Sequence, residues 1–133
     1  MIRAACLLDV PELLVLEEKL FPNAMSEKML QHELSRGWGW VVPAVGPITG
    51  YVLVRKDEDL LDITRLGVDE NSRGQGLGKR LLLHVLADGR DVVLTVKKDN
   101  LTAIHLYRSH GFEIVGHLIA AGAWVMRVRG VVT

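Results

Sequence analysis

The stretch Arg73-Gly74-Gln75-Gly76-Leu77-Gly78-Lys79-Arg80 decides how the whole chain is interpreted. Its three glycines allow a tight turn in which backbone N–H groups converge, and the helical pattern that follows adds the positive end of a helix dipole. The stretch therefore predicts an anion-binding loop between a strand and a helix. It is not a nucleotide P-loop, because Arg80 stands where Ser or Thr is needed. It is not a dinucleotide fingerprint either, because Lys79 replaces the third glycine.

Around this loop the chain has the composition of an ordinary globular protein. Its 133 residues fit a single domain, which we expect to span residues 1–133. No apolar run approaches the roughly 20 residues that cross a bilayer, and the first residues lack a signal-peptide pattern, so we expect a cytoplasmic protein without membrane contact. Residues 1–60 carry nine acidic and six basic side chains, and residues 61–133 carry seven and ten. Without a basic tract, a nucleic-acid partner is disfavoured, whereas a small anion on the C-terminal half fits.

The cysteine and histidine residues give no sign of a metal site. Cys6 is the single cysteine, and we expect it to be a small buried hydrophobic residue. The histidines lie in no metal-ligand spacing and are interpreted as surface or capping residues, so no metal is expected. They are His32, His84, His105, His110 and His117.

Hydrophobic periodicity predicts the order β-α-α-β-β-β-α-β-α-β-β. The strands are expected over residues 2–5, 38–42, 49–54, 60–68, 91–96, 112–115 and 123–128, and the helices over 9–20, 26–37, 78–88 and 101–110. Residues 9–12 read as a capping box, Ser26 as an N-cap, and Gly37 and Gly111 as left-handed helix stops.

A second segment, from Asn100 to Phe112, has the pattern Asn-x-x-Ala-x-x-Leu-Tyr-x-x-x-Gly-Phe. Each of these residues also has a structural reading as a cap, core residue or helix stop. Together with the glycine loop, which fits Arg/Gln-x-x-Gly-x-Gly/Ala, the segment resembles the GNAT superfamily of N-acetyltransferases in the family's order. The resemblance implies an α+β fold, with a central mixed, mostly antiparallel sheet and helices on both faces. It also implies that acetyl passes from acetyl-CoA to a primary amine by direct attack in a ternary complex.

The resemblance also implies how acetyl-CoA is held. Asn100 would bond the pantetheine arm, which would pair with the third long strand, and Tyr107 would point its hydroxyl at the thioester sulfur. Gly67 is placed to form a bulge that separates this strand from the next. The strand residues concerned are Leu66, Gly67 and Val68, and the diphosphate would lie on the amides of Arg73, Gly74, Gln75, Gly76, Leu77, Gly78 and Lys79.

Within the superfamily, the segment Glu17 to Glu27 resembles the ribosomal-protein N-terminal acetyltransferases of the RimI type. The resemblance implies that the acceptor is a protein N-terminus and that Phe21, Pro22 and Met25 shape its site. There are two departures from the pattern. Met25 replaces the subfamily's loop tryptophan, and residues 116–123 lack its tyrosines.

A third departure concerns the general base. Thr95 stands where this type carries a catalytic glutamate, and a threonine cannot accept a proton usefully at neutral pH. Asp62 is the substitute candidate, although we expect an acid at the start of a strand to be solvated. Two other functions stay open: acetylation of a small amine such as a polyamine or aminoglycoside, and CoA binding without turnover. The oligomeric state is not predicted.

Overall fold

The computed structural model describes residues 1–130 and contains one seven-stranded sheet in the order β1-β2-β3-β4-β5-β7-β6. Every neighbouring pair of strands is antiparallel except β4 and β5, which are parallel. The predicted order of helices and strands is confirmed, and so is the α+β class. Within residues 1–130, none of the helices has the length and hydropathy needed to cross a membrane. The strands are β1 (Arg3–Ala4), β2 (Trp38–Val42), β3 (Gly50–Lys56), β4 (Leu60–Val68), β5 (Asp91–Lys97), β6 (Glu113–Leu118) and β7 (Ala123–Val128).

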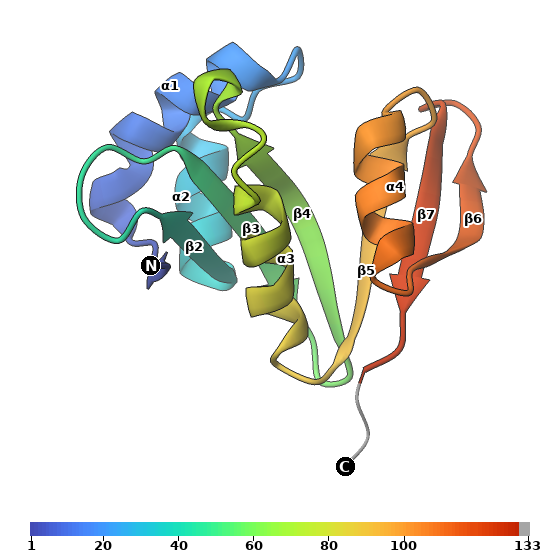
Figure 1. Cartoon of the computed structure of the whole chain (residues 1–133). Coiled ribbons are helices and arrows are strands. Elements are labelled where there is room, and N and C mark those ends of the chain that lie inside the picture. Colours follow the sequence, from blue (N-terminus) through green and yellow to red (C-terminus); the bar gives the residue numbers. More distant parts are fainter. Residues whose placement is uncertain (131–133) are drawn as a thin grey trace.

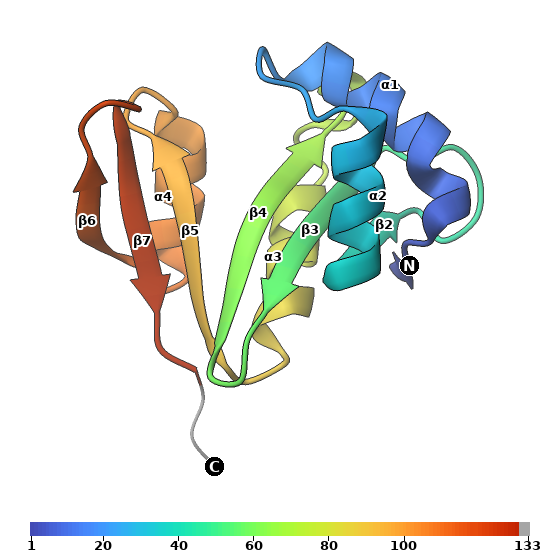
Figure 2. The same cartoon turned by 180° about the vertical axis from the view of Figure 1, so that it is seen from behind.

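The helices lie on both faces of the sheet (Figures 1 and 2). One core lies beneath α1 and α2 and includes Leu13, Leu30 and Tyr51, all with no exposed surface. The other lies beneath α3 and α4 and includes Leu81 and Leu94. The four helices are α1 (Val10–Leu20), α2 (Glu27–Arg36), α3 (Leu77–Leu86) and α4 (Leu101–Ser109), with short 3₁₀ turns at Leu7–Asp9 and Glu70–Ser72.

Strands β4 and β5 pair along only part of their length. The register joins Leu60–Ile63 to Asp91–Leu94, and beyond that point the two strands diverge (Figure 1). Strand β5 continues on β7 as far as Lys97, and β4 continues on β3 as far as Val68, so each side of this fork stays a hydrogen-bonded sheet. The fork therefore leaves two strand edges without a neighbour in the sheet.

A β-bulge at Thr64 changes which side chains of β4 face which core. Leu53 pairs with Arg65 and Val54 with Ile63, so Thr64 has no partner on β3. Ile63, before the bulge, and Leu66, after it, both pack in the α3–α4 core. Arg65, between them, therefore points to the opposite face of the sheet, where it contacts α1. The prediction of a bulge at Gly67 is wrong, because Gly67 pairs regularly with β3.

The predicted helix ends are confirmed in part. The Ser26 hydroxyl accepts a hydrogen bond from the Met29 N–H at 3.2 Å, and Gly111 has the left-handed φ of +90°. Gly37 is not a left-handed stop, since its φ is −126° and the chain passes directly into β2. A side chain there would collide with the Val54 carbonyl oxygen, so close backbone approach explains this glycine.

Two expectations near the N-terminus are wrong. Asp9 does not cap α1. Instead its carboxylate accepts the Cys6 N–H and pairs with Arg3 at 2.8 and 2.9 Å, closing the 3₁₀ turn before the helix. The hydrogen bonds from the Arg3 guanidinium, together with the one from the Cys6 N–H, lower the pKa of the Asp9 carboxyl. Cys6 itself is exposed rather than buried.

Candidate active site

The glycine loop has the geometry expected of an anion site. Gly74 and Gly76 have φ of +82° and +76°, and a Cβ built on either would meet nothing within 4 Å, so the space over the loop is open. Helix α3 begins at Leu77 with neither a side-chain cap nor an acidic residue in its first turn. The first N–H groups of the helix are thus left for an external acceptor. At Gly78 a Cβ would make ordinary contacts at 3.8 Å, which fits a Gly/Ala position.

Charged side chains surround this loop. Arg73 donates from Nε to the Val68 carbonyl oxygen at 3.2 Å, which fastens the loop to the end of β4. Lys79 and Arg80 are exposed in the first turn of α3. Gln75 and Arg80 also line a hollow of about 220 Å³ between the loop and the ends of β2 and β3. Positively charged side chains therefore flank the loop.

The edge of β4 that follows the fork leads to this loop. From Leu66 to Val68 the strand has no partner on its β5 side, so the backbone groups pointing that way are free of sheet hydrogen bonds. A Cβ at Gly67 would lie 3.1 Å from the Tyr51 ring and 3.2 Å from Leu20. Crowding on the α1 face, and not a bulge, therefore explains the glycine.

Helix α4 supplies the two residues predicted from the second motif. The Asn100 side chain caps the helix, accepting the Ala103 N–H at 3.2 Å, and its exposed amide nitrogen is left to donate. Tyr107 is 7% exposed, with its ring 5.6 Å from that of Phe112. The Tyr107 hydroxyl has no hydrogen-bond partner among the described residues. In residues 1–130, no buried side-chain polar atom lacks a partner, so this hydroxyl is not fully buried and is accessible to solvent. Burial raises the pKa of Tyr107 to about 12.

Asp62 lies one residue before the fork, paired in register with Arg55 on β3 and Val93 on β5. The side chain of Asp62 is only partly exposed, so the expectation that it is solvated holds in part. Burial raises the pKa of this carboxyl, Arg55 opposes the rise, and the nearby Glu33 adds to it. Thr95 is exposed two residues beyond Val93, so it shares the face of the sheet on which Asp62 lies. A carboxylate poised above its ordinary pKa can accept a proton there.

The segment between α1 and α2 borders β4 on that same face. Phe21 is partly buried and Pro22 is exposed. Met25 is only 7% exposed and packs in the α1–α2 core, which leaves it little surface to offer an acceptor. Burial of Met25 could not be inferred from its position in the motif, because the loop path depends on contacts with β4 that are distant in sequence.

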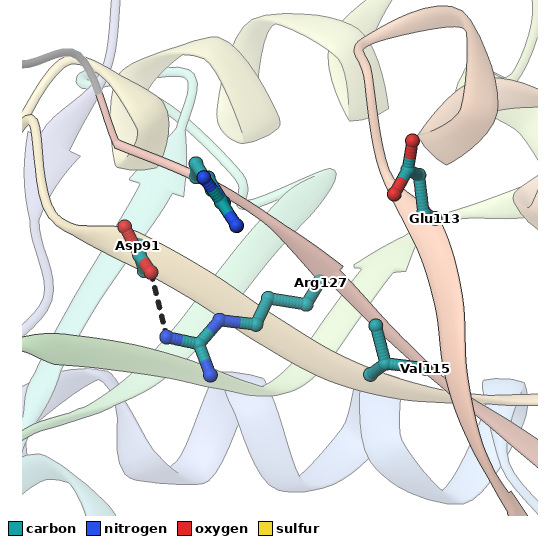
Figure 3. Close-up of a pocket in the computed structure, with 5 residues that line it drawn as sticks. Asp91, Glu113, Val115 and Arg127 are labelled. Atoms are coloured by element: carbon teal, nitrogen blue, oxygen red, sulfur yellow. Dashed lines mark hydrogen bonds and ion pairs between the residues drawn. The ribbon is translucent and has the colours of Figure 1, made fainter.

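A hollow of about 610 Å³ lies elsewhere, on the face of the β5–β7–β6 arm that α4 does not cover (Figure 3). Its lining contains none of the predicted site residues, and Arg127 pairs there with Asp91 at 2.6 Å. Within residues 1–130, no three His, Cys, Asp or Glu side chains are placed to hold a metal ion. The hollow is lined by Asp91, Glu113, Val115, Arg127 and Arg129.

Comparisons with known proteins agree with this geometry. Residues 9–112 match the model of the acetyltransferase (GNAT) family. Over 94 residues the chain is 37% identical to the N-alpha-acetyltransferase RimI of Mycobacterium tuberculosis, covering 62% of this chain and 60% of that protein. It is 33% identical over 108 residues to a mycothiol acetyltransferase of Mycolicibacterium gilvum, covering 66% of this chain and 36% of that protein. The chain thus spans less than two thirds of the length of these relatives.

Among solved structures, the fold matches the ribosomal-protein-S18-alanine N-acetyltransferase of Escherichia coli with a TM-score of 0.90. The match covers 100% of this chain and 95% of that one, at 22% sequence identity. At this sequence identity, the similarity shows a shared fold alone.

Proposed function

The chain belongs to the acetyltransferase (GNAT) family, and on that premise we propose that it is an acetyl-CoA-dependent N-acetyltransferase acting on a primary amine. The observation that carries the proposal is the fork after Ile63 and Leu94. It leaves the end of β4 without a sheet neighbour, and the open glycine loop follows that end along the chain. Tyr107, with its accessible hydroxyl, lies on α4, on the other side of the fork. The loop has room for a ligand, since a Cβ built at Gly74 or Gly76 would meet nothing within 4 Å.

Each part of the donor has a counterpart in this arrangement. The amides from Gly74 to Lys79, at the start of α3, would hold the diphosphate, whereas the Arg73 N–H already donates to the Glu70 carbonyl oxygen at 3.4 Å. The free edge of β4 from Leu66 to Val68 would pair with the two amide groups of the pantetheine arm, as a further strand would. Asn100 would close the arm from the α4 side through its free amide nitrogen.

The donor supplies an activated thioester, from which the amine displaces a thiolate as the C–N bond forms and the C–S bond breaks. Tyr107 would donate a hydrogen bond to the departing sulfur. With a pKa of about 12, Tyr107 lies far above a free thiol, whose pKa is about 8.5. Full proton transfer would therefore be uphill by about 5 kcal/mol, which favours hydrogen-bond donation over protonation by Tyr107.

On the acceptor side we propose a protein N-terminal α-amine, with Asp62 taking its proton. Phe21 and Pro22 would shape the site, and the RimI relative supports this class. An α-amine with a pKa of about 7.8 is neutral in roughly a quarter of molecules at pH 7.4, whereas a lysine at about 10.4 is neutral in about one per thousand. A single partly buried carboxylate on the acceptor face therefore suits an N-terminus better than a lysine.

A small-molecule amine is the second candidate, supported by the mycothiol acetyltransferase relative. The β6–β7 turn is short, and its tip carries the exposed Leu118 and Ile119, 46% and 80% exposed, in place of bulky aromatic groups. CoA binding without turnover is the third candidate, since Thr95 cannot act as a base.

One experiment distinguishes the three. The protein is incubated with acetyl-CoA and a mixed panel of peptide N-termini, internal lysines and polyamines, and products are resolved by mass spectrometry. We expect acetylated N-termini. Acetylation of polyamines alone would favour the small-amine function. A rise in melting temperature with acetyl-CoA but no product would favour the binding module, and no rise at millimolar acetyl-CoA would contradict all three.

A further inference from the structure

Glu17 is a fully buried carboxylate that the proposed chemistry does not use. Located on α1 with no exposed surface, it is satisfied by three partners. Its Oε1 accepts the Met25 N–H at 2.8 Å, and its Oε2 accepts the Tyr51 hydroxyl at 2.5 Å. Arg65 of β4 completes the set, donating from Nε at 2.9 Å and from Nη2 at 2.9 Å. A buried charge with this many donors fixes the geometry of the elements that carry them.

Arg65 extends this network onto the segment between α1 and α2. Its Nη2 also donates to the Asn23 carbonyl oxygen at 3.0 Å, and its guanidinium lies over the Phe21 ring, 4.2 Å from the centroid. Only 13% of the Arg65 side chain is exposed. One guanidinium therefore touches the start, the middle and, through Glu17, the end of the Phe21–Met25 loop.

The Thr64 bulge makes this contact possible. Under strict strand alternation Arg65 would lie on the same face as Leu61 and Ile63, inside the α3–α4 core. The extra residue reverses the faces, so Arg65 points to α1 while Leu66, its neighbour on the free edge, packs on the other side. The same strand thus carries the proposed donor edge and the fastening of the acceptor loop.

We propose that Arg65 is a positioning residue that holds the Phe21–Met25 loop in the shape that receives the acceptor amine. The inference rests on the proposed function, because it takes this loop as the acceptor site. Lysine is not an equivalent residue at position 65. It would keep a positive charge beside Glu17, but it has no planar fork to reach both carboxylate oxygens and the Asn23 carbonyl or to stack on Phe21.

The test compares Arg65→Lys with Arg3→Lys, a matched control. Arg3 makes the same two-pronged pair with Asp9 near the start of α1, whereas Arg65 acts at the other end of that helix. For Arg65→Lys we expect the acceptor KM to rise about tenfold or more, with kcat and the acetyl-CoA dissociation constant changed less than about threefold. The amides of residues 23–25 should exchange with deuterium faster. Arg3→Lys should leave both readouts at native values.

Tyr51→Phe removes one hydroxyl contact to Glu17 and should change both readouts in the same direction, by less. If the KM rises equally in Arg3→Lys, or if the Met25 amide exchanges at the native rate in Arg65→Lys, the positioning role is refuted. Deuterium exchange needs no substrate. A native protein that acetylates no amine would therefore contradict the proposed function while the exchange rates still decide whether Arg65 holds the loop.

Discussion

The two strands that border the fork are built differently on the face away from α4. On β4, Asp62 and Arg65 are partly buried, and each lies near an acidic side chain of a helix. Glu33 of α2 lies near Asp62, and Glu17 of α1 pairs with Arg65. On β5, Thr95 and Lys97 are exposed on that face, and Thr95 carries no ionisable group. Strand β5 instead contributes through α4, which brings Asn100 and Tyr107 to the opposite side.

This difference divides the proposed work between the two sides. The β4 side fastens the acceptor loop and holds the one carboxylate whose pKa is raised near the fork, while the β5 side supplies groups for the donor. A base on β5, as the RimI type implies, would sit in solvent, whereas burial on β4 raises the pKa of Asp62 towards the neutral range where a base is useful. Four substitutions test this division, from the largest expected effect to the smallest.

The first tests the loop that both sides share. In Gly76→Val the side chain would cover the open amides, and acetyl-CoA should no longer raise the melting temperature. For the native protein at 100 times the dissociation constant, the gain should be about 2.7 kcal/mol. Gly46→Val is the matched control, since Gly46 also has a positive φ, +98°, with open space above it. It should lose similar stability through backbone strain but keep the full acetyl-CoA shift. Equal loss in both would remove the loop from the cofactor site.

The second tests the donor side. Tyr107→Phe should lower kcat about 10²-fold, near the low end for such a group, because Tyr107 donates a hydrogen bond rather than a proton. The melting temperature should hardly change, since the hydroxyl has no partner among the described residues. Acetyl-CoA affinity should also be close to native by calorimetry. Native turnover would show that Tyr107 only packs.

The third tests the acceptor side. Asp62→Asn should slow acetylation about tenfold for a peptide N-terminus at pH 7, and by about 10² for a lysine, which depends more on a base. In the native protein the rate should fall as pH drops through the raised pKa of Asp62, and this limb should be absent in the variant. An unchanged pH–rate profile would exclude Asp62 as the base.

The same substitution has a separate effect on stability. Because burial raises the pKa of Asp62, the folded state binds the proton more tightly than the unfolded state. Stability should therefore decrease as pH rises from the ordinary aspartate range through the raised pKa. Asp62→Asn removes this cost, so its melting temperature should exceed that of the native protein at pH 7 and the difference should vanish below the ordinary range. A difference that grows on acidification would show the opposite sign.

The fourth substitution tests whether a side chain on β5 can act as the general base. Thr95→Glu places a carboxylate on the exposed face of that strand, where solvent screens it, so we expect only about a threefold gain with lysine peptides. Thr95→Gln matches the shape without the charge and should give none. A gain of 10² or more in Thr95→Glu would mean that the missing glutamate, rather than burial of Asp62, controls the rate.

The helix and strand order could be predicted from the sequence because each element carries its own periodicity, and Gly111 and Ser26 act within a few residues of their effects. The predictions of a left-handed stop at Gly37 and of a bulge at Gly67 fail for one reason. The atoms that crowd these two positions, the Val54 carbonyl and the Tyr51 ring, both belong to β3, which is distant in sequence from either glycine. Local conformational preference gives no information about such contacts.

The network of Glu17 and Arg65 could not be assigned either, because the two residues are 48 positions apart. One signal was available. Arg65 interrupts the alternation that Leu61 and Ile63 begin, and an arginine facing a core implies a bulge in between. Asp62 was assigned to solvent because nothing in the sequence shows that α2 approaches that end of β4.

Within residues 1–130 the chain crosses the fork only once. Everything from β1 to α3 precedes the link around Gly89, and everything from β5 to β7 follows it, so the two sides are contiguous in sequence as well as in space. Ala87 and Asp88 in this link are exposed. A cut there would yield two unbroken pieces, joined by the four paired residues on each strand and by a core that Leu61 and Leu94 share. If acetyl-CoA binds between the two pieces, it holds them together. The protein is then suited to a fragment-complementation assay that reports acyl-CoA.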